Sequence, residues 1–279
     1  MKLKTRFGIA CGALALLFSG AWGGVAAGAG LAHGSHAAGS GLHLKRAGYL
    51  TVGSDTTYPP MEFQSPSTKQ YMGADVDLAN ALARAMGLKG AVIVSHIFDT
   101  IIPSLQRGDF DVIMSSMNDT PARRQQVSFV DYMRAGEGIV VRKGSSIKAN
   151  GYGQVCGHSV AVESGTTEFS GLQAANATCK KKINIKVYPL DTAAFQAFAA
   201  GHAEAYSGDS VVCGYYVKQH PSTFRLAGAP FAASEDYGIA VRKNNHALRT
   251  ALQSALAKIR ANGQYKRILN KWGVNIASL

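Results

Sequence analysis

The segment Asp111–Arg123 reads DVIMSSMNDTPAR and brings together residue types suited to binding a carboxylate. Its apolar start is followed by small polar residues, namely Ser115, Ser116 and Asn118. Thr120 and Pro121 then predict the N-cap and first residue of a helix, with Arg123 on its first turn. A bidentate cation and several free backbone N–H groups thus meet at one place. We expect this place to hold the α-carboxylate of an amino acid.

Two more polar turns occupy comparable positions later in the chain. Gly165–Thr166–Thr167 follows a predicted strand, where it forms either a plain capping turn or a set of N–H and hydroxyl donors for an anion. Gly208–Asp209 follows another strand at a helix start, where Asp209 can serve as N-cap, stabilise an ammonium group, or do both.

Three further residues near turns are candidates for contact with a ligand side chain. Tyr58 and Phe98 are single aromatics beside turns, where such residues usually belong to the core. Asp55 directly follows a strand. Its carboxylate either accepts hydrogen bonds within the turn at Thr56–Tyr58 or binds a polar or cationic group of the ligand side chain.

The positions of these residues depend on alternating strands and helices from residue 49 onward. Helices are predicted around Val76–Met86 and Leu248–Ile259, and Asp99 and Asp191 are expected to cap helices of their own. Strands that alternate with helices predict an α/β fold with largely parallel sheets. In such sheets ligands bind beyond the carboxyl ends of the strands.

The sequence lacks the motifs of common catalytic sites. It contains no G-x-S-x-G, H-E-x-x-H, P-loop or G-x-G-x-x-G pattern, and no histidine stands beside a credible nucleophile. We expect a non-catalytic binding protein that uses no cofactor and no metal.

The charge of the chain is basic but dispersed. The formal net charge is +12, and the densest run of cations is Lys180–Lys182. No zinc-finger or RNA-binding motif accompanies it, so we interpret the excess as a solvated surface and expect no nucleic-acid partner.

The N-terminus has the pattern of an exported protein. Residues 1–29 have a charged start, an apolar centre and small residues at two candidate cleavage sites, which predicts a secretory signal peptide. Residues 30–42 are rich in Gly, Ala, Ser and His and predict a flexible tether. Export permits disulfides. Cys156 and Cys179 lie at neighbouring element ends and are expected to pair, whereas Cys213 is expected to be a buried free thiol.

Several ordered segments resemble the family 3 bacterial solute-binding proteins, the polar amino-acid receptors of ABC importers. The resemblance runs from about Leu50 to Trp272. The segments that carry it are VGSDTTYPPMEF at 52–63, GADVDLANALARAMG at 73–87, FDTIIPSLQRGDFDVIMSSMNDTPAR at 98–123, ESGTTEF at 163–169, YGIAVRKNN at 237–245 and NGQYKRILNKWG at 262–273.

The resemblance implies a two-lobed periplasmic-binding fold of type II that closes over its ligand. Each lobe would contain a mixed, mainly parallel sheet flanked by helices, with two hinge strands between the lobes. Lobe 1 would take residues 43–135 and 236–279, and lobe 2 would take 139–232.

The resemblance also implies roles for the candidate residues. Arg123 and the Thr167 N–H would hold the α-carboxylate, and Asp209 and a Ser116 oxygen the α-amino group. Tyr58 and Phe98 would sandwich the side chain, with Asp55 and Asn118 tuning specificity. The candidate ligand-binding set is therefore Asp55, Tyr58, Phe98, Ser115, Ser116, Asn118, Arg123, Thr166, Thr167 and Asp209.

One departure from the family pattern is Asp119, which stands where an apolar residue is usual. It either faces solvent, which we expect, or adds negative charge near the ligand-binding cleft. The functional expectation is a monomeric periplasmic receptor that delivers an amino acid to an ABC permease in the inner membrane. The alternative is an enzyme of the same fold, such as a periplasmic cyclohexadienyl (prephenate/arogenate) dehydratase.

Overall fold

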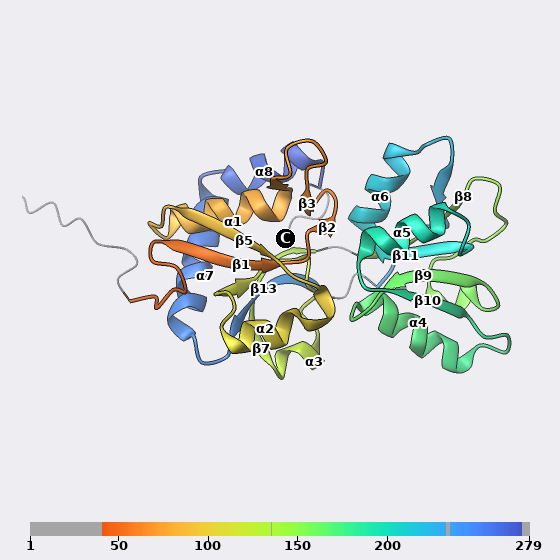
Figure 1. Cartoon of the computed structure of the whole chain (residues 1–279), viewed down its shortest axis with the longest axis horizontal. Coiled ribbons are helices and arrows are strands. Elements are labelled where there is room, and N and C mark those ends of the chain that lie inside the picture. The colour runs from red at the N-terminus through yellow and green to blue at the C-terminus, as the bar shows by residue number, and fades with distance from the viewer. Residues whose placement is uncertain (1–40, 135, 233–234, 275–279) are drawn as a thin grey trace, which may run out of the picture. The chain divides into compact units, whose positions relative to one another are not determined.

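The computed structural model describes residues 41–134, 136–232 and 235–274. The predicted signal peptide and nearly all of the predicted tether lie outside these residues. Within them, two five-stranded sheets and one small three-stranded sheet carry the flanking helices (Figure 1). We call the first five-stranded sheet with its helices lobe 1 and the second with its helices lobe 2.

The sheet of lobe 1 has the strand order β5-β1-β6-β13-β7. In that order the strands are Gly90–Ser95, Tyr49–Ser54, Val112–Ile113, Asp236–Arg242 and Val127–Arg134. Only β13 runs against the other four, because it pairs antiparallel with both β6 and β7 whereas β1 pairs parallel with β5 and β6. The chain thus returns to this sheet after passing through lobe 2.

The sheet of lobe 2 repeats this plan with the order β10-β9-β11-β8-β12. The strands are Asn184–Tyr188, Ser159–Glu163, Ala205–Asp209, Glu137–Arg142 and Phe224–Leu226. Here β8 is the one strand that runs against the rest. The carboxyl ends of β9 and β11 consequently lie on the same edge of the sheet, as the sequence predicted for its polar turns.

The helices pack on the sheets through their buried residues, except α3, none of whose residues is buried. Lobe 1 has α1 (Ala74–Ala85), α2 (Ile101–Arg107), α3 (Pro121–Arg124), α7 (His246–Ala261) and α8 (Gln264–Trp272). Lobe 2 has α4 (Thr167–Thr178), α5 (Asp191–Ala199) and α6 (Ser210–Gln219). One core joins α1, α7 and α8 to the sheet of lobe 1, and Leu78, Leu252 and Leu256 belong to it. Burying each such side chain contributes about 1.5–3 kcal/mol.

A short additional sheet lies between β1 and α1 in the chain, within the first segment of lobe 1. It consists of β2 (Thr57–Tyr58), β3 (Glu62–Gln64) and β4 (Tyr71–Met72). The sequence did not predict these strands, since each is too short to show a two-residue period. These strands matter because β2, which contains Tyr58, contacts α5 of lobe 2.

Two helix starts differ from the sequence prediction. Asp99 does not cap α2; it lies inside a 3₁₀ turn, Phe98–Thr100, and no side-chain cap bond is made there. Asp191 is the first residue of α5 rather than its N-cap, and its carboxylate accepts hydrogen bonds from the hydroxyls of Tyr206 and Tyr216. Leaving a buried tyrosine hydroxyl without a hydrogen bond costs more free energy than leaving an exposed backbone N–H without one. The Asp191 carboxylate therefore accepts from the two tyrosines instead of capping the helix.

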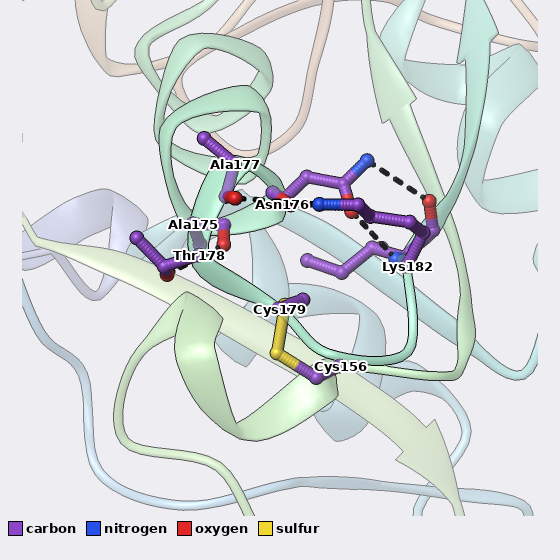
Figure 2. The surroundings of a disulfide bond; sticks show 8 residues. Cys156, Ala175, Asn176, Ala177, Thr178, Cys179 and Lys182 are labelled. Atoms are coloured by element: carbon purple, nitrogen blue, oxygen red, sulfur yellow. Dashed lines mark hydrogen bonds between the residues drawn. A yellow bond between two sulfur atoms is a disulfide. The ribbon is translucent and has the colours of Figure 1, made fainter.

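Lobe 2 contains the predicted disulfide between Cys156 and Cys179 (Figure 2). Cys156 follows the 3₁₀ turn Tyr152–Val155 and Cys179 ends α4, with 5.5 Å between their Cα atoms. The Lys182 ammonium donates to the carbonyls of Asn176 and Ala177 and so satisfies the end of the same helix. Cys213 is free and buried, as predicted. Among the residues described, no helix has the length and apolar character needed to cross a membrane.

Candidate functional site

The N-terminus of α3 forms as the sequence predicted and fixes Arg123. The Thr120 hydroxyl accepts the backbone N–H of Arg123 at 3.1 Å, and Pro121 occupies the first helical turn. The half-buried guanidinium donates to the carbonyls of Asn118 at 3.0 Å and Gly165 at 3.1 Å. Its carbon also lies 5.2 Å from the centroid of the Phe98 ring. Arg123 is therefore held between the two lobes, with its charge available to an anion.

The segment before α3 is bent so that its polar groups face inward. Ser115 is fully buried, and its hydroxyl accepts the backbone N–H of Asp55 at 2.8 Å. Ser116 has a positive φ of 45°, which is unusual for a residue with a side chain. It keeps this conformation because its N–H donates to Asp75 at 3.1 Å and its hydroxyl donates to Glu62 at 3.2 Å.

Lobe 2 contributes the start of α4. The Thr166 hydroxyl caps this helix by accepting the Phe169 N–H at 3.1 Å. The Thr167 hydroxyl donates to the Asn118 side chain at 3.3 Å. Gly165 has φ +77°, and a Cβ there would approach Asp99 of lobe 1 to 2.8 Å. Only glycine permits this close approach of the two lobes.

Asp209 ends β11 at the N-cap position of α6 but makes no side-chain cap bond. It is buried, and its Oδ1 has no hydrogen-bond partner among the described residues. Burial and the neighbouring charge of Glu168 raise the pKa of Asp209 well above its usual value. A buried carboxylate oxygen without a donor is costly, and a cation placed there would stabilise it.

Phe98 contacts both Asp55 and Tyr58. Asp55 is buried and accepts the Phe98 N–H at 3.1 Å and the Thr57 hydroxyl at 2.6 Å. The rings of Tyr58 and Phe98 pack edge to face, with centroids 6.0 Å apart. The Tyr58 hydroxyl donates across to Glu163 of lobe 2.

The contacts therefore bring the predicted residues of the two lobes together. Direct hydrogen bonds between lobes join Tyr58 to Glu163, Asn118 to Thr167 and Arg123 to Gly165. Asp209 belongs to the same region, because its charge acts on both Arg123 and Glu62. Ser115 and Thr166 support the backbone through their own hydrogen bonds.

Sequence reasoning missed a group of buried acids around these residues. The carboxyl groups concerned are those of Glu62, Asp75, Glu137, Glu163, Glu168 and Asp191. Burial is the main cause that raises the pKa of each, to about 6 for Asp75 and about 7 for Glu137 and Asp191. One signal could have found Glu163, since it is the last residue of a strand, just as Asp55 directly follows one.

The expectation for Asp119 is wrong. This residue is only 6% exposed, and its carboxylate pairs with Arg124 at 2.7 Å instead of facing solvent. It also lines a surface pocket with Asp131 and Asp236. The pairing explains how an acid replaces an apolar residue here, because Arg124 covers the charge and its own guanidinium remains exposed.

The arrangement places groups that favour an anion near groups that favour a cation, as a zwitterionic ligand requires. Arg123 and the N-terminus of α4 favour an anion, while Asp209 and the turn at Ser116 favour a cation. The described residues contain no cluster of His, Cys, Asp and Glu that could hold a metal ion.

Known proteins share this sequence and this fold. The family model for bacterial extracellular solute-binding proteins, family 3, matches residues 50–275. ABC transporter arginine-binding protein 1 of Escherichia coli (strain K12) is 30% identical over 227 residues, which cover 80% of this chain and 90% of that protein.

Two solved structures extend the comparison. An ancestral arginine-binding protein bound to arginine has a TM-score of 0.76 at 34% identity, covering 81% of this chain and 98% of the other. The ancestral amino acid-binding protein AncCDT-1, a precursor of cyclohexadienyl dehydratase, has a TM-score of 0.71 at 34% identity, covering 81% and 95%. With its two-lobed α/β fold and with polar residues of both lobes meeting at one site, this chain belongs to the family 3 bacterial extracellular solute-binding proteins.

Proposed function

We propose that this protein is the periplasmic receptor of an ABC importer and that it encloses an amino acid with a polar or charged side chain. The observation that carries the proposal is the pairing of opposite charges from the two lobes. Arg123 of lobe 1 and the start of α4 in lobe 2 face one position, and Asp209, whose Oδ1 lacks a donor, faces another. An α-carboxylate and an α-ammonium group satisfy both.

In this proposal the ligand closes one lobe over the other. Lobe 1 comprises residues 43–135 and 236–279, and lobe 2 comprises 139–232, so the chain crosses between them twice. Arg123 and the Thr167 N–H bind the α-carboxylate, Asp209 and Ser116 the α-amino group. Tyr58 and Phe98 contact the ligand side chain, and Asp55 and Asn118 determine its identity.

The transport role follows from the family. The relative from Escherichia coli is named as an arginine-binding protein of an ABC transporter. We infer that this chain likewise acts as a monomer that delivers its ligand to an inner-membrane permease, after export by a signal peptide at residues 1–29.

A thermal-shift screen tests the proposal. The panel contains the standard amino acids, ornithine, opines and prephenate. A true ligand at about 100 times its dissociation constant adds about 2.7 kcal/mol to the free energy of unfolding. At least one amino acid is expected to raise the melting temperature. The receptor proposal fails if no amino acid does.

The enzyme alternative is favoured by one comparison, the likeness to a precursor of cyclohexadienyl dehydratase. Glu163 and Glu62 are buried acids whose raised pKa suits a proton donor. Incubation with prephenate distinguishes the two functions, because the receptor returns it unchanged and a dehydratase converts it into phenylpyruvate, carbon dioxide and water.

A further inference from the structure

Two buried acids of lobe 1 contact Ser116. Glu62 in β3 is fully buried, and Asp75 in the first turn of α1 is 1% exposed. The Ser116 hydroxyl donates to Glu62 Oε2 at 3.2 Å, and the Ser116 N–H donates to Asp75 Oδ2 at 3.1 Å. Ser116 therefore gives its hydroxyl proton to one acid and its backbone proton to the other.

A junction that requires glycine brings these two acids together. Gly73 precedes α1 with φ +135°, and a Cβ there would lie 2.0 Å from the carbonyl oxygen of Met61. The same carbonyl accepts the Asp75 N–H at 2.9 Å. Because Glu62 directly follows Met61, the close approach at Gly73 fixes both acids relative to each other.

Asp75 is also held by groups other than Ser116. The hydroxyl of Tyr132, a fully buried side chain, donates to Asp75 Oδ2 at 2.6 Å. The N-terminus of α1 favours a carboxylate in its first turn. Asp75 is thus a fixed acceptor for the N–H of Ser116, whose positive φ of 45° is strained for a residue with a side chain. The hydrogen bond to Asp75 stabilises that conformation.

The hydrogen bond to Glu62 decides what the Ser116 hydroxyl can offer a ligand. A serine hydroxyl has one proton to donate and accepts through its lone pairs. Since Glu62 takes the proton, the hydroxyl oxygen can only accept from a ligand, and an ammonium group only donates. Burial and the charges of Asp75 and Asp209 raise the pKa of Glu62 well above its usual value. A neutral carboxyl group still accepts through its carbonyl oxygen, so the arrangement needs no charge on Glu62.

We propose that Glu62 and Asp75 are positioning residues of the α-amino site, which hold Ser116 so that it accepts a hydrogen bond from the α-ammonium group of the ligand. This inference rests on the proposed receptor function and adds two residues that act through Ser116. Asp209 of lobe 2 supplies the opposite charge for the ammonium group, and its own charge acts on Glu62. The two acids should therefore matter for the α-amino group and not for the rest of the ligand.

Calorimetry of the full protein with two ligands tests this role. The ligands are arginine and 5-guanidinopentanoic acid, which is arginine without its α-amino group. Glu62→Met removes the acceptor and nearly keeps the side-chain volume. We expect arginine affinity to fall about tenfold or more, and the affinity of 5-guanidinopentanoic acid to change by less than about threefold. A purely structural defect would weaken both ligands by the same factor.

The variant Glu62→Gln separates positioning from charge. Glutamine keeps a carbonyl oxygen that can accept the Ser116 proton, so we expect arginine affinity within about threefold of wild type. Asp77→Asn is the matched control, because Asp77 lies in the same turn of α1 but is partly exposed and pairs with Lys271 at 2.7 Å. It should bind both ligands as wild type does.

A second pair of variants tests the backbone of Ser116. Asp75→Ala should weaken arginine binding about tenfold, because the strained conformation loses its acceptor. Glycine adopts positive φ without strain, so in a Ser116→Gly background the same Asp75→Ala change should cost less than about threefold. Equal losses in the two backgrounds would show that Asp75 does not act through Ser116, and would overturn its role.

The Glu62 series overturns the proposal in three ways. Wild-type arginine affinity in Glu62→Met, an equal loss for both ligands, or a loss in Glu62→Gln as large as in Glu62→Met would each do so. If the analogue binds too weakly to measure, the comparison of the Met and Gln variants decides. If Glu62→Met does not fold, the Asp75 variants decide.

The receptor function can be judged separately from this inference. If another amino acid binds and arginine does not, the receptor function stands, and the same variants are measured with that amino acid and its desamino analogue. If wild type binds an amino acid and the variants behave otherwise than expected, only this inference fails. If no amino acid binds to wild type, the receptor function fails and the inference fails with it.

Discussion

Replacing Arg123 with alanine is expected to weaken amino-acid binding by two to four orders of magnitude and leave the fold intact. The guanidinium can give two hydrogen bonds to a carboxylate, and each such charge-assisted bond is worth about 1.5–3 kcal/mol. Their loss amounts to about 3–6 kcal/mol, or roughly 10²–10⁴ in the dissociation constant.

The structure indicates why stability should change little. Among the described residues, the Arg123 guanidinium donates to the carbonyls of Asn118 and Gly165, and the side chain is not part of a hydrophobic core. The cap of α3 uses the backbone N–H of Arg123, which alanine retains. We therefore expect a loss of unfolding free energy of about 1 kcal/mol or less.

Calorimetry with the ligand found by thermal shift measures the effect. Arg123→Lys keeps the charge but loses the planar fork, and its affinity should fall between those of wild type and alanine. Arg107→Ala is the matched control, because Arg107 is an exposed arginine of lobe 1 in an ion pair with Asp109. Wild-type affinity in a folded Arg123→Ala protein would show that the carboxylate binds elsewhere.

Two further predictions concern stability. The double variant Cys156→Ser/Cys179→Ser should lower the free energy of unfolding by about 3 kcal/mol, because the disulfide closes a loop between residues 23 apart. Urea denaturation measures this loss, and an unchanged midpoint would contradict the prediction. The ligand-free protein should also lose stability as the pH rises from 5 to 8. In the folded state Asp191 and Glu137 have a pKa of about 7, which is higher than in the unfolded chain, so the folded state binds protons more tightly. The contribution of these two protons to the free energy of unfolding is complete below pH 4 and is lost as the pH rises through 7. The expected loss is of order 2–4 kcal/mol between urea titrations at pH 5 and pH 8, and a gain would refute it.

The fold and one part of the site follow from short-range patterns. Thr120 and Pro121 predict the start of α3, and the two Thr residues after Gly165 predict the start of α4, because capping depends on a few adjacent residues. The alternation of strands and helices predicts two sheets whose strand ends carry these turns.

The buried acids could not be found in the same way. Acidic residues are usually exposed, and nothing adjacent to Glu62 or Asp75 in the chain shows that both contact Ser116. Asp191 resembles a cap in sequence because its tyrosine partners lie further along the chain. Asp119 was misplaced for a related reason, since its burial depends on Arg124 folding back over it. Such pairings are fixed by tertiary structure.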